Sequence, residues 1–191
     1  MKYFKTYESF KGTGFLTDPA EIEAWLDEMD ITNYTIGKDG IVDVNTSVFI
    51  SVKKLKKFPI QFGKIDGSFL CGFNQLETLK GAPEKVSNNF SCRSNQLKTL
   101  EGAPKEIHGT FFCENNQLIN LIGMPEVKCK VSFDDNRGIP AEILHKMYIL
   151  MKKNKTDWDT EIKKYSQDDP TVIRHLPKEE LKRLGLNKEK N

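Results

Sequence analysis

The sequence lacks several features on which whole classes of protein depend. No run of about 18 apolar residues occurs, so no segment is suited to a membrane-spanning helix. The formal net charge is only +2, which excludes the strong electrostatic field used to hold nucleic acid or a membrane surface. Charged residues from Lys2 onward interrupt any apolar core near the start, so we expect no signal peptide and no membrane partner.

Residues that commonly carry catalysis or bind metals are also scarce. The phosphate-binding pattern Gly-x-x-x-x-Gly-Lys-Ser/Thr and the zinc-binding pattern His-Glu-x-x-His are both absent. The three histidines are scattered: His108, His145 and His175. A divalent-cation site is one alternative, formed by Glu114, Asp134 and Asp135, although acidic surface residues are usually only solvated. We therefore expect no enzyme activity, no metal and no cofactor.

What is present is a repeat of 21 residues between positions 48 and 136. Three clear copies share their Cys, Asn, two Leu, Gly and Pro positions, which are Cys71, Asn74, Leu76, Leu79, Gly81 and Pro83 in the first of them. A degenerate copy begins at Val48, and a last copy at Val131 arrives one residue early. A period of about 20 to 29 residues with this pattern is typical of a solenoid.

The copy from residue 90 shows how one repeat works. Phe90-Ser91-Cys92 alternates apolar and polar residues, which predicts a short strand with Phe90 and Cys92 pointing inward. Asn95 then turns the chain, since its amide can bond backbone groups of its own and of adjacent coils. Leucines and β-branched residues complete the interior: Leu97, Leu100, and Val86 or Ile107. Neighbouring coils must stack to bury these side chains, so we expect a parallel sheet on one face and irregular returns on the other.

The repeated cysteines have two interpretations. Stacked coils place Cys71, Cys92 and Cys113 in a row about 4.8 Å apart, whereas a zinc site needs four ligands around one point. Cysteine also packs as a small apolar residue, and the last copy has Phe133 at this position. We favour a buried ladder, with Cys129 a lone thiol outside it.

Helical patterns flank the repeats. Asp18 is a predicted N-cap before Pro19, with Glu21 in a capping-box arrangement. One face of this helix is apolar: Ile22, Trp25, Leu26 and Met29. A hairpin is predicted over residues 31–44, and helices over 140–153, 157–165, from Asp169 and over 177–184. We divide the chain into an N-terminal arm (1–17), an N-terminal cap of helix and hairpin (18–47), leucine-rich repeats (48–137) and a C-terminal helical cap and tail (138–191).

The repeated motif Phe-x-Cys-x-x-Asn-x-Leu-x-x-Leu-x-Gly-Ala-Pro resembles the core of short bacterial-type leucine-rich repeats over residues 40–137. The Gly-Ala-Pro return, with Cys in the strand, resembles a largely uncharacterised set of repeat proteins encoded by tailed bacteriophages and some bacteria. This resemblance implies an α/β leucine-rich-repeat solenoid with short parallel strands and capped ends. It also implies binding to other macromolecules, because such solenoids mostly serve that purpose. Residues 1–11 are similar to short leaders that target proteins of large tailed phages to the prohead.

The outward side of the predicted strands is the strongest functional signal. Alternation places Phe49 and Leu70 outside in the first two coils, and a neighbouring column of the face adds Val52 and Phe73. Phe112 continues the column of Phe49 and Leu70, but the later coils otherwise become polar and then acidic: Arg93, Glu114, Asn115, Asp134 and Asp135. An apolar patch rimmed by polar residues marks an interaction surface. The alternative is that the N-terminal arm or the hairpin of the same chain covers the patch.

Two functions of different class follow. In the first, the chain is a non-enzymatic, phage-encoded protein that binds a host or phage protein in the host cytoplasm through its outward strand face. In the second, it is a structural or packaged virion component that self-associates and carries residues 1–11 as a targeting leader. Nucleic acid is a third and weaker partner, suggested by four lysines near the first coil that also suit a soluble sheet edge: Lys53, Lys54, Lys56 and Lys57.

Overall fold

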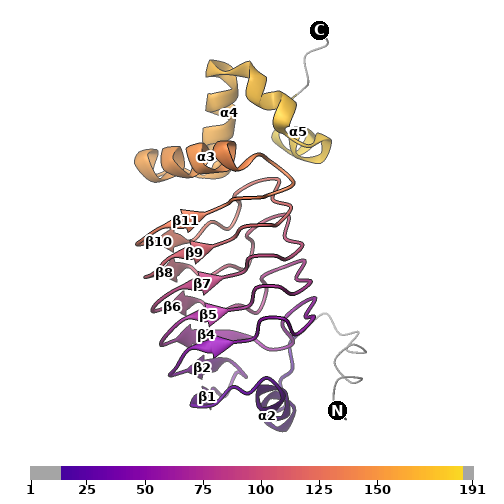
Figure 1. Ribbon diagram of the computed structural model, residues 1–191, viewed down its shortest axis with the longest axis vertical. Coiled ribbons are helices and arrows are strands. Elements are labelled where there is room, and N and C mark those ends of the chain that lie inside the picture. The colour runs from indigo at the N-terminus through magenta and orange to yellow at the C-terminus, as the bar shows by residue number, and fades with distance from the viewer. Residues whose placement is uncertain (1–13, 187–191) are drawn as a thin grey trace.

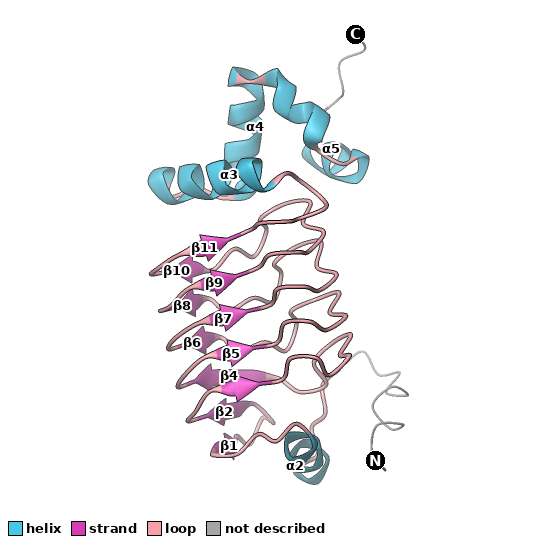
Figure 2. Ribbon diagram, in the orientation of Figure 1, coloured by secondary structure: helices cyan, strands magenta, loops and turns pink. Residues whose placement is uncertain are grey.

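Two sheets of very short strands form the wall of a solenoid in the computed structural model, which describes residues 14–186 (Figure 1). One sheet, sheet A, has the order β1 (Tyr34–Ile36), β2 (Val42–Val44), β4 (Phe62–Ile65), β6 (Lys85–Val86), β8 (Glu106–Ile107) and β10 (Glu126–Val127). The other, sheet B, has the order β3 (Val48–Phe49), β5 (Phe69–Leu70), β7 (Phe90–Ser91), β9 (Phe111–Phe112) and β11 (Val131–Ser132). Neighbouring strands are parallel except in the β1–β2 hairpin, so the repeat region is a parallel β-solenoid (Figure 2).

The back of the solenoid differs from our expectation. We predicted irregular returns there, but β4, β6, β8 and β10 form a second parallel sheet, so that prediction was wrong. Val86 and Ile107 point inward as the predicted back wall, and the preceding Lys85 and Glu106 point outward. Lys85 aligns with Glu106 and Val86 with Ile107, because the members of each pair are 21 positions apart. Stacking of the two coils then completes the hydrogen-bond ladder between these strands.

The interior is built from ladders of identical side chains. The rings of Phe69, Phe90 and Phe111 follow one another with centroids 5.7 Å apart at each step. Beside them the row of cysteines is fully buried, and burial raises the pKa of the Cys71 and Cys92 thiols well above their ordinary value. The inward position predicted for these cysteines is therefore confirmed. Cys129 lies outside the row and is exposed.

A ladder of asparagines fixes each coil to the one before it. Asn95 accepts a hydrogen bond at Oδ1 from the Leu76 backbone N–H at 2.9 Å. Its Nδ2 donates to the carbonyl oxygens of Cys92 at 2.9 Å and of Cys71 at 3.2 Å. Asn74 and Asn116 make the same set of bonds in their own coils. The predicted bonds of asparagine to its own and to adjacent coils are confirmed.

Helix α2 (Pro19–Glu28) lies at the N-terminal end of the solenoid (Figure 1). The Asp18 side chain accepts from the Ala20 backbone N–H at 2.9 Å, which confirms the predicted N-cap. The predicted apolar face is buried, and Trp25 meets the ring of Phe62 edge-on at 6.0 Å. The predicted hairpin is also present, and its strand β2 joins β4 to extend sheet A.

Four helical segments follow the last coil: α3 (Ala141–Asn154), α4 (Trp158–Asp168), the 3-10 helix η1 (Pro170–His175) and α5 (Lys178–Leu184). Their bounds lie within three residues of the predicted ones, and α5 ends at Gly185 with φ 69°. The ring of Phe133, at the end of the cysteine row, contacts His145 and Tyr148 of α3 edge-on at 5.2 and 6.3 Å. Helix α3 therefore packs on the last coil.

A buried carboxylate ties the C-terminal helices together and to the solenoid. Glu180 is 1% exposed. It accepts from Trp158 Nε1 at 2.7 Å, from Asn120 Nδ2 of the last return at 3.1 Å, and from Arg183 Nε and Nη2 at 2.9 and 2.7 Å. Arg183 also bridges Asp159, and these carboxylates raise the pKa of its guanidinium. Every buried charge in this network has a partner, as a buried charge requires.

Candidate protein-binding face

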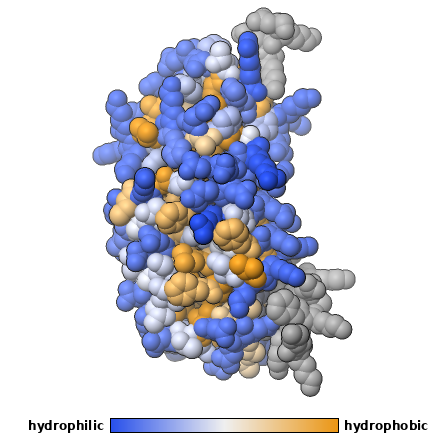
Figure 3. All heavy atoms as spheres, viewed as in Figure 1, coloured by the Kyte–Doolittle hydropathy of each residue, from blue (hydrophilic) through white to orange (hydrophobic). Residues whose placement is uncertain are grey.

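The outward face of sheet B gathers the apolar residues that the sequence predicted there. We call Phe49, Val52, Leu70 and Phe73 the apolar patch. The side chains of Phe49, Val52 and Phe73 are 64%, 71% and 52% exposed, and Leu70 is half-buried. The strands set them side by side, since Phe49 pairs with Leu70, and Val52 N–H donates to Gly72 O at 3.2 Å. Figure 3 shows this face, with hydrophobic residues gathered over its N-terminal half.

Two members of the patch have an unusual backbone. The residue that precedes the turning position, which is Lys53 in the first coil and asparagine in the others, is left-handed in every coil. Its φ is 61° at Val52, 54° at Phe73, 54° at Ser94, 52° at Asn115 and 54° at Asp135. Asparagine and aspartate tolerate this region, whereas a β-branched or bulky residue there is strained. The first two coils thus have exposed apolar side chains, Val52 and Phe73, at positions whose left-handed backbone disfavours these residue types. Strain retained in this way is typical of functional sites.

Arg93 borders the patch on the next coil. Its guanidinium lies over the Phe73 ring, 4.9 Å from the centroid. Gly72 makes this arrangement possible, because a Cβ at that position would lie 3.1 Å from Arg93 Cγ. The arginine side chain therefore runs across Gly72 and holds the exposed Phe73 ring. Sequence reasoning counted Arg93 among the outward residues but missed this contact.

The C-terminal half of the face is acidic, as predicted. Asp134 and Asp135 are exposed, and Asp134 accepts from Ser132 Oγ at 3.0 Å. The Glu114 Oε2 atom is buried and has no hydrogen-bond partner among the described residues. Phe112 is half-buried, and Asn115 donates to Ser94 at 3.2 Å. Within residues 14–186, these carboxylates have no ion-pair partner and do not form part of a cluster that could hold a metal ion.

The outward face of sheet A has a different character. Glu106 bonds Lys85 Nζ at 2.9 Å and His108 Nε2 at 2.7 Å, and Lys105 pairs with Glu84 at 3.0 Å. The hydrogen bonds from Lys85 and His108 lower the pKa of Glu106 to about 2. Among residues 14–186, these charges on the outward side of sheet A pair with one another, whereas the carboxylates of sheet B have no ion-pair partner.

Of the two segments that could cover the apolar patch, the hairpin and the N-terminal arm, the hairpin can be placed. The hairpin of β1 and β2 pairs with β4 in sheet A, so it does not cover the apolar patch on sheet B. The N-terminal arm before Gly14, including the leader-like residues 1–11, lies outside the described residues. Within the weaker nucleic-acid cluster, Lys53 pairs with Asp30 at 3.8 Å, and Lys54, Lys56 and Lys57 are exposed.

Comparisons with known proteins give no match, so the solenoid fold and the outward face of sheet B are the observations from which a function can be argued. No family model, no curated protein and no solved structure matches this chain. Between residues 14 and 186, no helix combines the length and apolar character needed to cross a membrane.

Proposed function

We propose that this chain is a non-enzymatic protein-binding module that uses the outward face of sheet B. The observation that carries the proposal is the exposure of Val52 and Phe73 in left-handed backbone. Aromatic anchors with a polar rim are the usual composition of a protein interface. Arg93 adds a residue type that is enriched at such centres.

We further propose that the solenoid belongs to the leucine-rich-repeat type and that its terminal helices act as caps. The repeated motif and the asparagine ladder support the first statement. The packing of Trp25 on Phe62 and of α3 on Phe133 supports the second, since a terminal coil otherwise exposes its apolar side.

The spacing of the face suggests what the partner carries. Coils are about 4.8 Å apart, so Phe73 is about 10 Å from the Glu114 coil and about 14 Å from the Asp135 coil. An extended peptide advances about 3.3 Å per residue, so these spans correspond to three or four residues. A segment lying along the solenoid would therefore place an apolar residue on the patch and a Lys or Arg three or four positions away, opposite the carboxylates.

A displayed library of random peptides tests this proposal. The wild-type chain is expected to select sequences in which an apolar residue and a basic residue are separated by that interval. The double variant Phe49→Glu/Phe73→Glu should lose the selection, because both side chains are exposed and their replacement removes the anchors without opening the core. Ser87→Glu/Asn88→Glu, at two exposed positions away from sheet B, is the matched control for the two added charges.

Light scattering on the same variants separates the virion-component alternative. A defined oligomer that dissociates in Phe49→Glu/Phe73→Glu would replace the partner-binding proposal with self-association through sheet B. A monomer that selects no peptide motif would refute both uses of the face.

A further inference from the structure

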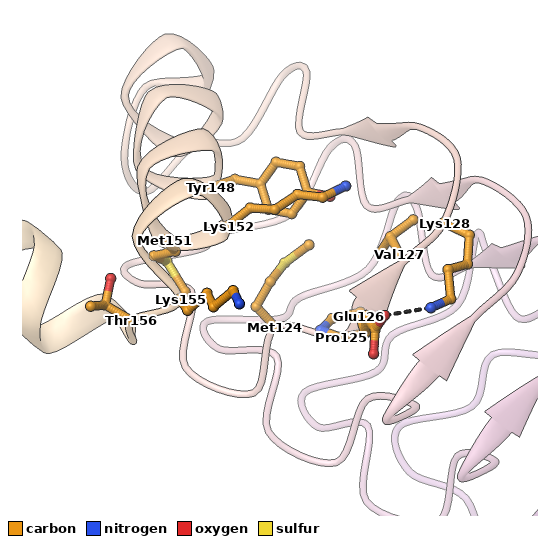
Figure 4. Close-up of a pocket in the computed structure, with 10 residues that line it drawn as sticks. All are labelled: Met124, Pro125, Glu126, Val127, Lys128, Tyr148, Met151, Lys152, Lys155 and Thr156. Atoms are coloured by element: carbon orange, nitrogen blue, oxygen red, sulfur yellow. Dashed lines mark hydrogen bonds and ion pairs between the residues drawn. The ribbon is translucent and has the colours of Figure 1, made fainter.

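A hollow separate from sheet B lies where α3 meets the last return of the solenoid (Figure 4). Its volume is about 480 Å³, within the range of about 300–1,000 Å³ found for small-molecule sites. The apolar part of its lining comes from three elements: Met124 lies in the return, Val127 in β10, and Tyr148 and Met151 in α3. Two methionines give the hollow an adaptable apolar surface, since the thioether side chain is unbranched and flexible.

Lysines border this apolar surface on the side of α3. Figure 4 shows Lys152 extended over Tyr148 and Lys155 directed toward Met124, and the Lys152 Nζ lies 5.9 Å from the Tyr148 ring centroid. Within residues 14–186, neither lysine forms an ion pair. The carboxylate at the opposite wall, Glu126, is already paired with Lys128. The hollow therefore has uncompensated positive charge next to an apolar surface.

The backbone at Lys155 is a second, independent feature. This residue ends α3 in the left-handed region with φ 54°, a position that is usually glycine, as at Gly185 after α5. A lysine there disfavours the local backbone, yet it directs an ammonium group at the hollow. Complementing the helix dipole does not require it, because Lys152 and Lys153 already occupy the last turn.

We infer that this hollow binds a small amphipathic anion, with its apolar body on Met124, Tyr148 and Met151 and its carboxylate or phosphate between Lys152 and Lys155. The lysines recognise charge rather than shape, so both head groups fit. This site is separate from the face of sheet B and does not depend on the function proposed for that face.

Titration calorimetry of the full chain with decanoate and with decyl phosphate, below their micelle concentrations, tests the inference. Binding is expected for both anions and not for decanol, and it should weaken as salt is added. Lys152→Gln and Lys155→Gly should each weaken decanoate binding by roughly two- to fivefold, the effect of one exposed ion pair. Met124→Gln, which keeps the side-chain length, should weaken it by removing apolar contact.

Three controls make the result decisive. Lys153→Gln changes a neighbouring lysine that does not line the hollow, so it should bind decanoate as the wild type does. Phe73→Glu should also bind normally, which separates this site from sheet B. Lys155→Gly should unfold at a higher temperature than the wild type, because glycine adopts this backbone freely, so its weaker binding would not reflect lost folding. Equal binding of decanol and decanoate, or unchanged binding in Lys152→Gln/Lys155→Gly, would overturn the inference.

Discussion

Replacing Val52 by asparagine should make the protein more stable, although it removes an apolar side chain. Val52 has φ 61° and its side chain is 71% exposed, so little buried area is lost. A non-glycine residue in this region costs about 1–3 kcal/mol, and asparagine tolerates it best among the ordinary residues. We expect Val52→Asn to raise the free energy of unfolding by about 1 kcal/mol, which is about 2–4 °C in melting temperature for a chain of this size.

The solenoid supplies the reciprocal experiment. Asn115 occupies the same position in a later coil, with φ 52°. Asn115→Val should lower the free energy of unfolding by about 1–2 kcal/mol, because it introduces the same strain and removes the bond to Ser94. Urea unfolding followed by the fluorescence of the buried Trp25 and Trp158 measures both variants. If Val52→Asn destabilises the chain, or if both changes have the same sign, the strain argument for the patch is wrong.

Three further predictions concern the rest of the molecule. Glu180→Ala leaves the buried Trp158 indole and Asn120 amide donors without an acceptor and removes one of the two carboxylates bonded to Arg183, so it should cost about 3–5 kcal/mol in urea unfolding. The exposed Glu179→Ala should cost less than about 1 kcal/mol. Asn95→Ala should cost about 1–3 kcal/mol, because it leaves the buried Leu76 N–H without its acceptor and removes one of the two amide donors from each of the Cys71 and Cys92 carbonyl oxygens. The exposed Gln96→Ala serves as its control, and equal losses would contradict the ladder. In the folded protein the pKa of Glu106 is about 2, below its ordinary value of 4.5, so the stabilisation from its ionised form is present above pH 4.5 and is lost as the pH falls toward 2. When the free energy of unfolding is measured across that pH window, it should fall less steeply for Glu106→Gln than for the wild type.

The parts of the fold that could be predicted are those with a local or periodic cause. The N-cap at Asp18 requires only the adjacent first turn, and the 21-residue period shows which side chains of the repeats point inward. The strands of sheet A in the repeats could not be predicted from a local pattern. A two-residue strand such as Lys85–Val86 is too short for its alternation to stand out, and it forms only because the neighbouring coils pair with it.

The candidate site was predictable in its membership but not in its geometry. Alternation identified the outward residues of sheet B, yet nothing local showed that Val52 and Phe73 adopt left-handed backbone. The Ser, Asn and Asp at the equivalent positions of the later coils tolerate that conformation and were the available signal. The Glu180 network joins residues 22 and 60 positions apart, so only the folded chain brings its members together.

The asparagine ladder makes each coil interchangeable with its neighbours. Because Asn95 bonds the backbone of its own coil and of the preceding one, a coil presents the same donors and acceptors to whichever coil precedes it. Removing or duplicating one 21-residue period should therefore preserve the stacking while moving the acidic coils by about 4.8 Å relative to the apolar patch. Gain or loss of whole coils would thus alter in steps the peptide spacing that the face accepts, without any substitution at the contact residues.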